Sequence, residues 1–184
     1  MGSSPALPSE IYVVFCGAID QNSTQQFFKG LVGATTQDVK QIHILFQSTG
    51  GTVSDGIALY NFFRSLSVEL TLYNAGQVSS AALTAYLGAK NRKVSEYASF
   101  MIHRTTSPAI ALEGRKLRAM TESVFLDDER TEAILRKHLV MPDEKWAALE
   151  HNLWLTAKDA VKYGVADEIA EFAPPLGTRL FKLV

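Results

Sequence analysis

The chain has 184 residues, of which 47% are hydrophobic and 20% charged, a composition typical of one globular domain over residues 1–184. A balance of 18 basic against 19 acidic residues gives a net charge of -1, which argues against a nucleic-acid partner or an anionic membrane. The start MGSSPALPSE lacks the pattern of a signal peptide, and no apolar run approaches the ~20 residues that cross a bilayer. These features predict a soluble, cytoplasmic protein.

Short runs rich in β-branched and aromatic residues predict strands at 11–17, 42–47, 69–75 and 93–103. Helix-like stretches lie between them. Asn22 or Ser23 is expected to cap a helix that reaches the mid-thirties, and Ser54 is expected to cap the next one. A third helix is expected to begin within NAGQVSSAAL and to continue to Lys90. This alternation predicts an α/β fold of βαβ units with a mainly parallel sheet.

The single cysteine, Cys16, lies inside the apolar run IYVVFCGAI. One cysteine forms no disulfide framework and supplies no cluster of metal ligands. We therefore expect Cys16 to be a small buried apolar residue in a protein of a reducing compartment.

Beyond His103, about 29 residues of good helix formers (111–139) predict a helix longer than the average. We expect this helix to project or to pack against another subunit. Pro142 is expected to open a short helix. Thr156 and Asp159 resemble a capping box for a further helix, with Gly164 as its stop. The final APPLG predicts a turn that leads into an extended tail.

Three predicted strand ends carry most of the four groups that acyl transfer needs. These are a hydroxyl on a sharp strand-to-helix turn, a histidine to accept its proton, a group to orient that histidine, and N–H donors for the oxyanion. STGG (48–51) and GQVSS (76–80) each end a strand and start a helix, and MIH (101–103) ends another strand. Taken singly, each motif is also explained as a glycine turn, a pair of capping hydroxyls or a satisfied polar histidine.

In their order and spacing, these motifs resemble the proteolytic subunit of the Clp protease, a serine peptidase with a crotonase-like fold. The similarity runs from about Ile11 to Ala170. FQSTGGTVSDGIALYNFF is similar to a family segment with a serine, a proline and two glycines, and it has Thr49 in place of the proline. GQVSSAAL is similar to the nucleophile turn, and GAKNRK, FMIHRT and LTAKDAVKYGVADEI resemble three further family segments. Any one of these five matches is weak, but all five in the family's order are specific for the family.

The resemblance implies a ClpP-like serine endopeptidase. Ser80 becomes the nucleophile, because the family's serine is the fifth residue counted from the glycine of that turn, and Ser79 lines the turn. His103 becomes the general base, and the backbone N–H groups of Gly51 and Ala81 become the oxyanion hole. The resemblance also implies peptide or unfolded-protein substrates, a homo-oligomer built as a ring or stacked rings, and no metal or organic cofactor.

Asn152 departs from the family pattern. The third member of the family's triad is an aspartate just before an aromatic residue and a Ser/Thr-Ala pair, and in EHNLWLTA that position is Asn152. Asparagine can orient a histidine through its carbonyl oxygen, but it brings no negative charge. Three interpretations follow: a slow peptidase, a peptidase rescued by a nearby acid such as Glu150 or Asp167, or an inactive subunit that serves assembly.

The N-terminus is a second departure. Only about ten residues precede Ile11, where family members resemble one another in carrying an axial loop and a helix. Those elements serve ring packing and gating by a AAA+ unfoldase, so the sequence argues against such a partner. The rival enzyme class is an acyl-CoA enzyme of the crotonase type, which shares the fold, but neither catalytic carboxylates nor an adenine-binding groove can be identified.

Overall fold

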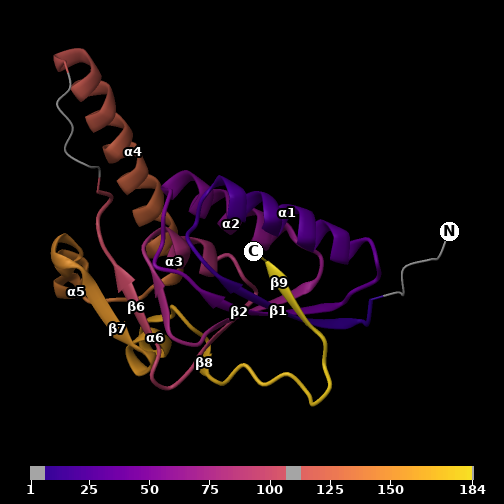
Figure 1. The fold of residues 1–184 in the computed structure, drawn as a ribbon. Coiled ribbons are helices and arrows are strands. Elements are labelled where there is room, and N and C mark those ends of the chain that lie inside the picture. Colours follow the sequence, from indigo (N-terminus) through magenta and orange to yellow (C-terminus); the bar gives the residue numbers. More distant parts are fainter. Residues whose placement is uncertain (1–6, 107–112, 184) are drawn as a thin grey trace.

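The computed structural model of the chain describes residues 7–106 and 113–183. Its centre is a six-stranded sheet in the order β8-β5-β3-β2-β1-β9, in which every neighbouring pair is parallel (Figure 1). The strands are β1 (Glu10–Cys16), β2 (Gln41–Gln47), β3 (Glu69–Asn74), β5 (Asn91–Val94), β8 (Glu168–Ile169) and β9 (Leu180–Leu183). The predicted α/β fold with a parallel sheet is confirmed, and the extended tail is a strand of that sheet.

A second, three-stranded sheet consists of β4 (Gln77–Ser79), β6 (Ser99–Ile102) and β7 (Leu153–Thr156). β4 and β6 are parallel, whereas β6 and β7 are antiparallel. The prediction of one strand over 93–103 is wrong, because a turn closed by Ala98 N–H and Ser95 C=O (3.0 Å) separates β5 from β6. The chain thus leaves the large sheet before β6, and the end of β6 comes to lie beside the end of β4.

The helices are α1 (Gln21–Thr35), α2 (Val53–Ser65), α3 (Ala81–Tyr86), α4 (Gly114–His138), α5 (Asp143–Ala147), the 3-10 helix η1 (Ala148–His151) and α6 (Ala157–Tyr163). α1 and α2 lie side by side over one face of the large sheet (Figure 1). The buried residues of β1 are Ile11, Val13 and Phe15, and they join one continuous apolar core with side chains from these helices.

Cys16 is exposed, which corrects the prediction that it is buried. Successive side chains of a strand point to opposite faces of the sheet. Because Ile11, Val13 and Phe15 face the core, Cys16 belongs to the other set, and it is the last residue of β1. An apolar run alone does not reveal this alternation.

Two predicted helix caps are also wrong. Asp20 caps α1, since its Oδ1 accepts a hydrogen bond from Ser23 N–H (2.8 Å) while Ser23 Oγ accepts one from Asp20 N–H (3.0 Å). Ser23 is therefore the reciprocal member of the capping box, and Asn22 already lies inside the helix. α2 begins after Thr52 without a side-chain cap, so Ser54 is a residue of the first turn.

α3 is shorter than predicted, because it ends at Tyr86 instead of Lys90. A Cβ on Gly88 would lie 2.5 Å from the carbonyl oxygen of Tyr60, so the chain passes against α2 there and the helix does not continue. The boundaries of α6 agree with those predicted from the sequence. Thr156 and Asp159 form the predicted capping box of α6, and Gly164 ends that helix with a φ of 84°.

α4 projects from the body of the molecule, as predicted (Figure 1). Only Leu135 near its base is buried, and Leu117, Phe125 and Leu126 are exposed along its length. The first two residues of the predicted helix, 111 and 112, lie outside the described residues. Within residues 7–106 and 113–183, no helix is both long and apolar enough to span a membrane.

His138 at the end of α4 makes stability depend on pH. Its Nε2 lies 2.9 Å from the hydroxyl of Tyr60. Burial, followed by the positive charges of Arg92 and Arg64, lowers the pKa of His138 from 6.5 to about 4. The unfolded chain therefore takes up a proton at higher pH than the folded one, and the free energy of unfolding should fall as the pH drops from 6.5 to about 4.

Urea unfolding at a series of pH values measures this slope. His138→Gln should flatten it between pH 6.5 and 4. The matched control is His151→Gln, at an exposed position of η1, which should leave the slope as it is. Equal slopes for the wild type and His138→Gln would contradict this explanation.

Candidate active site

Ser80 lies on the sharp turn between β4 and α3. It is the N-cap residue of α3, with a φ of 55° and a ψ of -131°, a backbone conformation that side-chain-bearing residues rarely adopt. Its N–H group donates a hydrogen bond to the carbonyl oxygen of Met101 in β6 (2.9 Å). A strained strand-to-helix turn of this kind presents a side chain outward from the end of a sheet.

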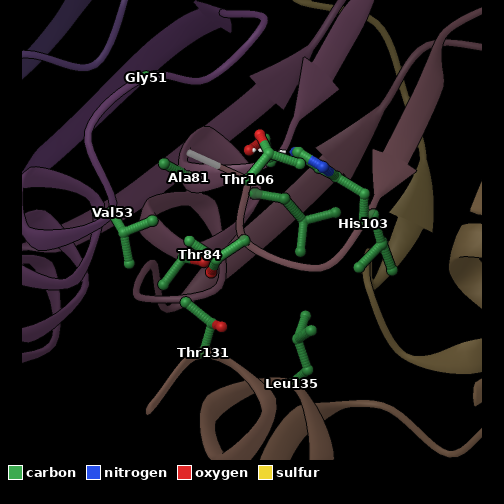
Figure 2. Close-up of a pocket in the computed structure, with 12 residues that line it drawn as sticks. Gly51, Val53, Ala81, Thr84, His103, Thr106, Thr131 and Leu135 are labelled. Atoms are coloured by element: carbon green, nitrogen blue, oxygen red, sulfur yellow. Dashed lines mark hydrogen bonds between the residues drawn. The ribbon is translucent and has the colours of Figure 1, made fainter. Parts of the chain in front are cut away.

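His103 lies directly opposite Ser80. It follows β6, and because β4 and β6 are parallel neighbours, their carboxyl ends meet at one edge of the small sheet. His103 Nε2 is 2.8 Å from Ser80 Oγ (Figure 2). At this distance the imidazole can accept the hydroxyl proton. The structure thus brings together two residues that are 23 positions apart in the sequence.

Ser79 is in a different environment from Ser80. Its side chain is fully buried, and its Oγ accepts a hydrogen bond from Gln77 Nε2 (2.8 Å). The N–H group of Ser79 donates to the carbonyl oxygen of Ser48 (3.0 Å), which ties β4 to the end of β2. Ser79 therefore holds the turn in place, as the sequence suggests, and its hydroxyl does not face His103.

Gly51 and Ala81 flank Ser80. Ala81 is the first residue of α3, so its N–H group is one of the donors that a helix start leaves without an intrahelical acceptor. Among the described residues, no acceptor is bound by the N–H of either Gly51 or Ala81. Both residues line the cavity that also contains Ser80 and His103. Two such donors at one point can stabilise a negatively charged oxygen.

The loop after β2 needs glycine at both of its positions. Gly50 and Gly51 have φ values of 104° and 153°, which favour glycine. A Cβ on Gly50 would lie 2.7 Å from Ser80 Cβ, and one on Gly51 would lie 2.1 Å from the carbonyl oxygen of Ile19. The loop therefore approaches the nucleophile turn as closely as a backbone can.

Gly51→Ala is accordingly expected to move this loop away and to slow acylation of Ser80 by about 10²- to 10³-fold, the usual cost of one lost oxyanion donor. The rate of adduct formation with a fluorophosphonate measures this, with circular dichroism to show that the variant is folded. Gly33→Ala, at a helix position where a Cβ meets nothing within 4 Å, is the matched control. A folded Gly51→Ala protein that reacts at the wild-type rate would contradict an oxyanion role.

Asn152 directly precedes β7 of the small sheet. β6 and β7 pair Met101 with Trp154 and Ile102 with Leu153, so His103 and Asn152 each adjoin the last pair of this ladder. Asn152 is exposed and has a φ of 60°. Within the part of the chain that the structure describes, no hydrogen bond joins Asn152 to His103. The role of Asn152 as the orienting residue stays a prediction.

The two acids suggested as substitutes for an aspartate are bound to arginines instead. Asp167 Oδ1 lies 2.7 Å from Arg92 Nη2, and its Oδ2 accepts a hydrogen bond from Arg92 N–H (2.7 Å). Glu150 Oε1 lies 3.3 Å from Arg104 Nε. Neither acid contacts His103, so the arrangement gives no support to the idea that one of them rescues the triad.

No motif in the sequence indicated a role for Arg104. It directly follows His103, and its guanidinium also pairs with Glu132 of α4. Its N–H group donates to the carbonyl oxygen of Leu149 in η1 (3.3 Å). Hydrogen bonding to Arg104 lowers the pKa of Glu132. Arg104 thus joins the segment after His103 both to the base of α4 and to the segment that ends at Asn152.

A cavity of about 70 Å³ opens beside Ser80 and His103 (Figure 2). Four of the residues that line it are apolar side chains, namely Val53, Leu83, Ile102 and Leu135. The threonines at positions 84, 105, 106 and 131 line it as well. No carboxylate side chain of the described residues lines it, so the cavity is suited to an uncharged group.

Comparison with known proteins identifies the family and the fold. The family model for the Clp protease matches residues 3–173. The chain belongs to the Clp protease family. A curated relative, the ATP-dependent Clp protease proteolytic subunit of Bacteroides thetaiotaomicron, is 26% identical over 141 residues, which is 71% of this chain and 60% of the relative. This chain thus matches little more than half of that relative's length.

The fold of this Clp protease family member is also found in a solved structure. An asparagine-to-aspartate mutant of ClpP1 from Listeria monocytogenes matches it with a TM-score of 0.76, over 87% of this chain and 91% of that chain. The sequences are 23% identical, so this likeness concerns the fold. It confirms the ClpP-like architecture expected from the sequence motifs.

Proposed function

We propose that the protein is a serine endopeptidase that cleaves peptides or unfolded proteins slowly, through an acyl-enzyme on Ser80. The observation that carries this proposal is the 2.8 Å contact between Ser80 Oγ and His103 Nε2. It lies beside a cavity lined by the N–H groups of Gly51 and Ala81, which bind no acceptor among the described residues. Membership of the Clp protease family supports the same reaction class.

In the proposed reaction, His103 Nε2 takes the proton of Ser80 Oγ as this oxygen bonds to the peptide carbonyl carbon. The carbonyl oxygen becomes negative and accepts hydrogen bonds from Gly51 and Ala81. The imidazolium then gives its proton to the peptide nitrogen, and the carbon–nitrogen bond breaks. His103 then takes a proton from water as the water oxygen attacks the ester. The imidazolium returns this proton to Ser80 Oγ as the ester carbon–oxygen bond breaks and the acid leaves.

Asn152 is the reason that the proposed peptidase is slow. During both steps His103 carries a positive charge, which an aspartate would stabilise and an asparagine does not. In one serine protease, the change from aspartate to asparagine lowers turnover by about 10⁴-fold. The oxyanion hole and substrate binding still contribute to catalysis. Together they accelerate the reaction by about 10³- to 10⁴-fold over the reaction in water.

The second candidate function is an inactive subunit that serves assembly. It is favoured by the exposed position of Asn152 and by the absence of a hydrogen bond between Asn152 and His103 among the described residues. An acyl-CoA enzyme of the crotonase type is less well supported, because the 70 Å³ cavity has no carboxylate in its described wall and is small for a thioester substrate.

The proposal extends to the setting of the reaction. One catalytic domain over residues 1–184 would assemble as a homo-oligomer, a ring or stacked rings, in the cytoplasm. The exposed apolar residues of α4, Leu117, Phe125 and Leu126, support contact with further subunits. No AAA+ unfoldase, nucleic acid or membrane is part of the proposal.

Digestion of an unfolded protein such as casein tests this proposal. We expect fragments to accumulate slowly and to disappear when the enzyme is first treated with a fluorophosphonate. An inactive subunit would yield no fragments after prolonged incubation. Fragments that persist after complete fluorophosphonate treatment would show that another enzyme, or another site, makes them.

A further inference from the structure

The cavity beside Ser80 is small. Its volume of about 70 Å³ is less than half of the ~150 Å³ of an engineered cavity that binds benzene. Leu83, which is 1% exposed, and Leu135, which is 6% exposed, belong to the core and give it firm walls. Because packed interiors resist expansion, a side chain larger than that of valine would have to displace these residues.

Two threonines line this cavity from different helices, Thr84 from α3 and Thr131 from α4, and they face each other in Figure 2. Thr131 Oγ1 lies 2.8 Å from the carbonyl oxygen of Asp127, so its proton is used within α4. Thr84 is 3% exposed as a whole residue and lines the cavity, and no hydrogen bond joins its hydroxyl to another group in the described part of the chain. A hydroxyl that lines the cavity can donate to and accept from a polar group of a ligand bound there.

The orientation of the bound acyl group directs one side chain into this cavity. In the acyl-enzyme, the acyl carbon is bonded to Ser80 Oγ, and the carbonyl oxygen faces the N–H groups of Gly51 and Ala81. The third atom bonded to the acyl carbon is the Cα of the substrate residue that supplied the carbonyl. In Figure 2, Thr131 and Leu135 lie across the cavity from Ala81 and His103. The side chain of that residue is the group closest to the threonines.

We propose that this cavity selects a small β-branched side chain on the residue whose carbonyl is attacked, with threonine first and valine second. This inference rests on the proposed peptidase function. The methyl group of threonine contacts Leu83 and Leu135, and its hydroxyl binds the hydroxyl of Thr84. Thr84 and Thr131 are thus specificity-determining residues.

The expected order of kcat/KM among peptides that differ only at this residue is threonine, valine, leucine and phenylalanine. Threonine should exceed valine by about three- to ten-fold, the usual net effect of one hydrogen bond. Leucine should lie at least about ten-fold below valine, because one extra methylene in a filled pocket changes specificity by about 10- to 200-fold. Phenylalanine should be cleaved at least about 100-fold more slowly than valine.

Release of aminocoumarin from four such peptides measures this order, in the wild type and in Asn152→Asp, which is expected to be faster. Thr84→Val keeps the shape of the side chain and removes the hydroxyl, so it should abolish the advantage of threonine over valine. Thr131→Ala enlarges the cavity and should raise the leucine-to-valine ratio by about ten-fold. The matched control is Thr121→Ala, an exposed threonine of α4 that bonds the carbonyl oxygen of Leu117 in the same way and should leave the order unchanged.

A fluorophosphonate has no amino-acid side chain, and therefore it reports the reactivity of Ser80 separately from the cavity. If the serine is labelled but phenylalanine or leucine is the preferred residue, the inference about the cavity is wrong and the peptidase function stands. An unchanged order in both Thr84→Val and Thr131→Ala would also overturn it. If neither the wild type nor Asn152→Asp is labelled, the proposed function and this inference both fail.

Discussion

Asn152→Asp is expected to raise the rate of acylation of Ser80 by up to about 10⁴-fold, the factor by which the reverse change slows a serine protease. The added carboxylate would stabilise the imidazolium of His103 and fix its tautomer. The backbone should accept the change, since aspartate shares with asparagine a tolerance for the left-handed conformation that Asn152 adopts (φ 60°). Its exposed position keeps the cost of adding the charge small.

The second-order rate of fluorophosphonate labelling, followed by intact mass, measures this effect. Asn22→Asp is the matched control, because it adds the same charge at an exposed position of α1. The control should react at the wild-type rate. Equal acceleration in both variants would show a general effect of charge, and a slower Asn152→Asp would show that Asn152 is not the orienting residue.

Ser80→Ala is expected to abolish labelling and peptide cleavage altogether. Removal of the nucleophile leaves no group to form the acyl-enzyme, and in a related reaction the loss of the serine alone lowers turnover by about 10⁶-fold. The backbone strain at position 80 stays the same in alanine, so the fold should be retained. Circular dichroism and unfolding by urea check this.

Ser79→Ala is the control for Ser80→Ala, since it removes the same hydroxyl one residue earlier. It leaves Gln77 Nε2 without its acceptor, so we expect a loss of stability of about 1 kcal/mol. The adduct should still form. If Ser79→Ala loses the adduct and Ser80→Ala keeps it, the nucleophile has been assigned one residue too far along the chain.

Much of the fold could be predicted from local patterns. β1, β2 and β3 are compact runs of β-branched and aromatic residues, and the capping box of α6 depends on four neighbouring residues. The predictions were wrong where contacts between residues far apart in the sequence determine the structure. Residues 93–103 have strand propensity throughout, but a turn at Ser95 passes the chain from the large sheet to the small one. Cys16 is exposed because of the face to which it points.

The candidate site also has parts that local patterns indicate and parts that depend on contacts between distant residues. The order of the motifs indicated Ser80 and His103. In the structure each follows one of two parallel strands, β4 and β6, and the two side chains lie within hydrogen-bonding distance. Long-range packing was not visible in the sequence. Thr131 reaches the cavity from α4, about fifty positions after Ser80, and Arg104 binds Glu150 away from His103. Such contacts depend on how α4 packs against the rest of the molecule.

The most direct test of an acyl-enzyme on Ser80 is to treat the wild-type protein with a fluorophosphonate and to locate the adduct by peptide mass spectrometry. We predict one adduct per chain, on Ser80, forming slowly in the wild type and rapidly in Asn152→Asp. An adduct on any other residue, or no adduct in either protein, would contradict the assignment of this site as a serine peptidase.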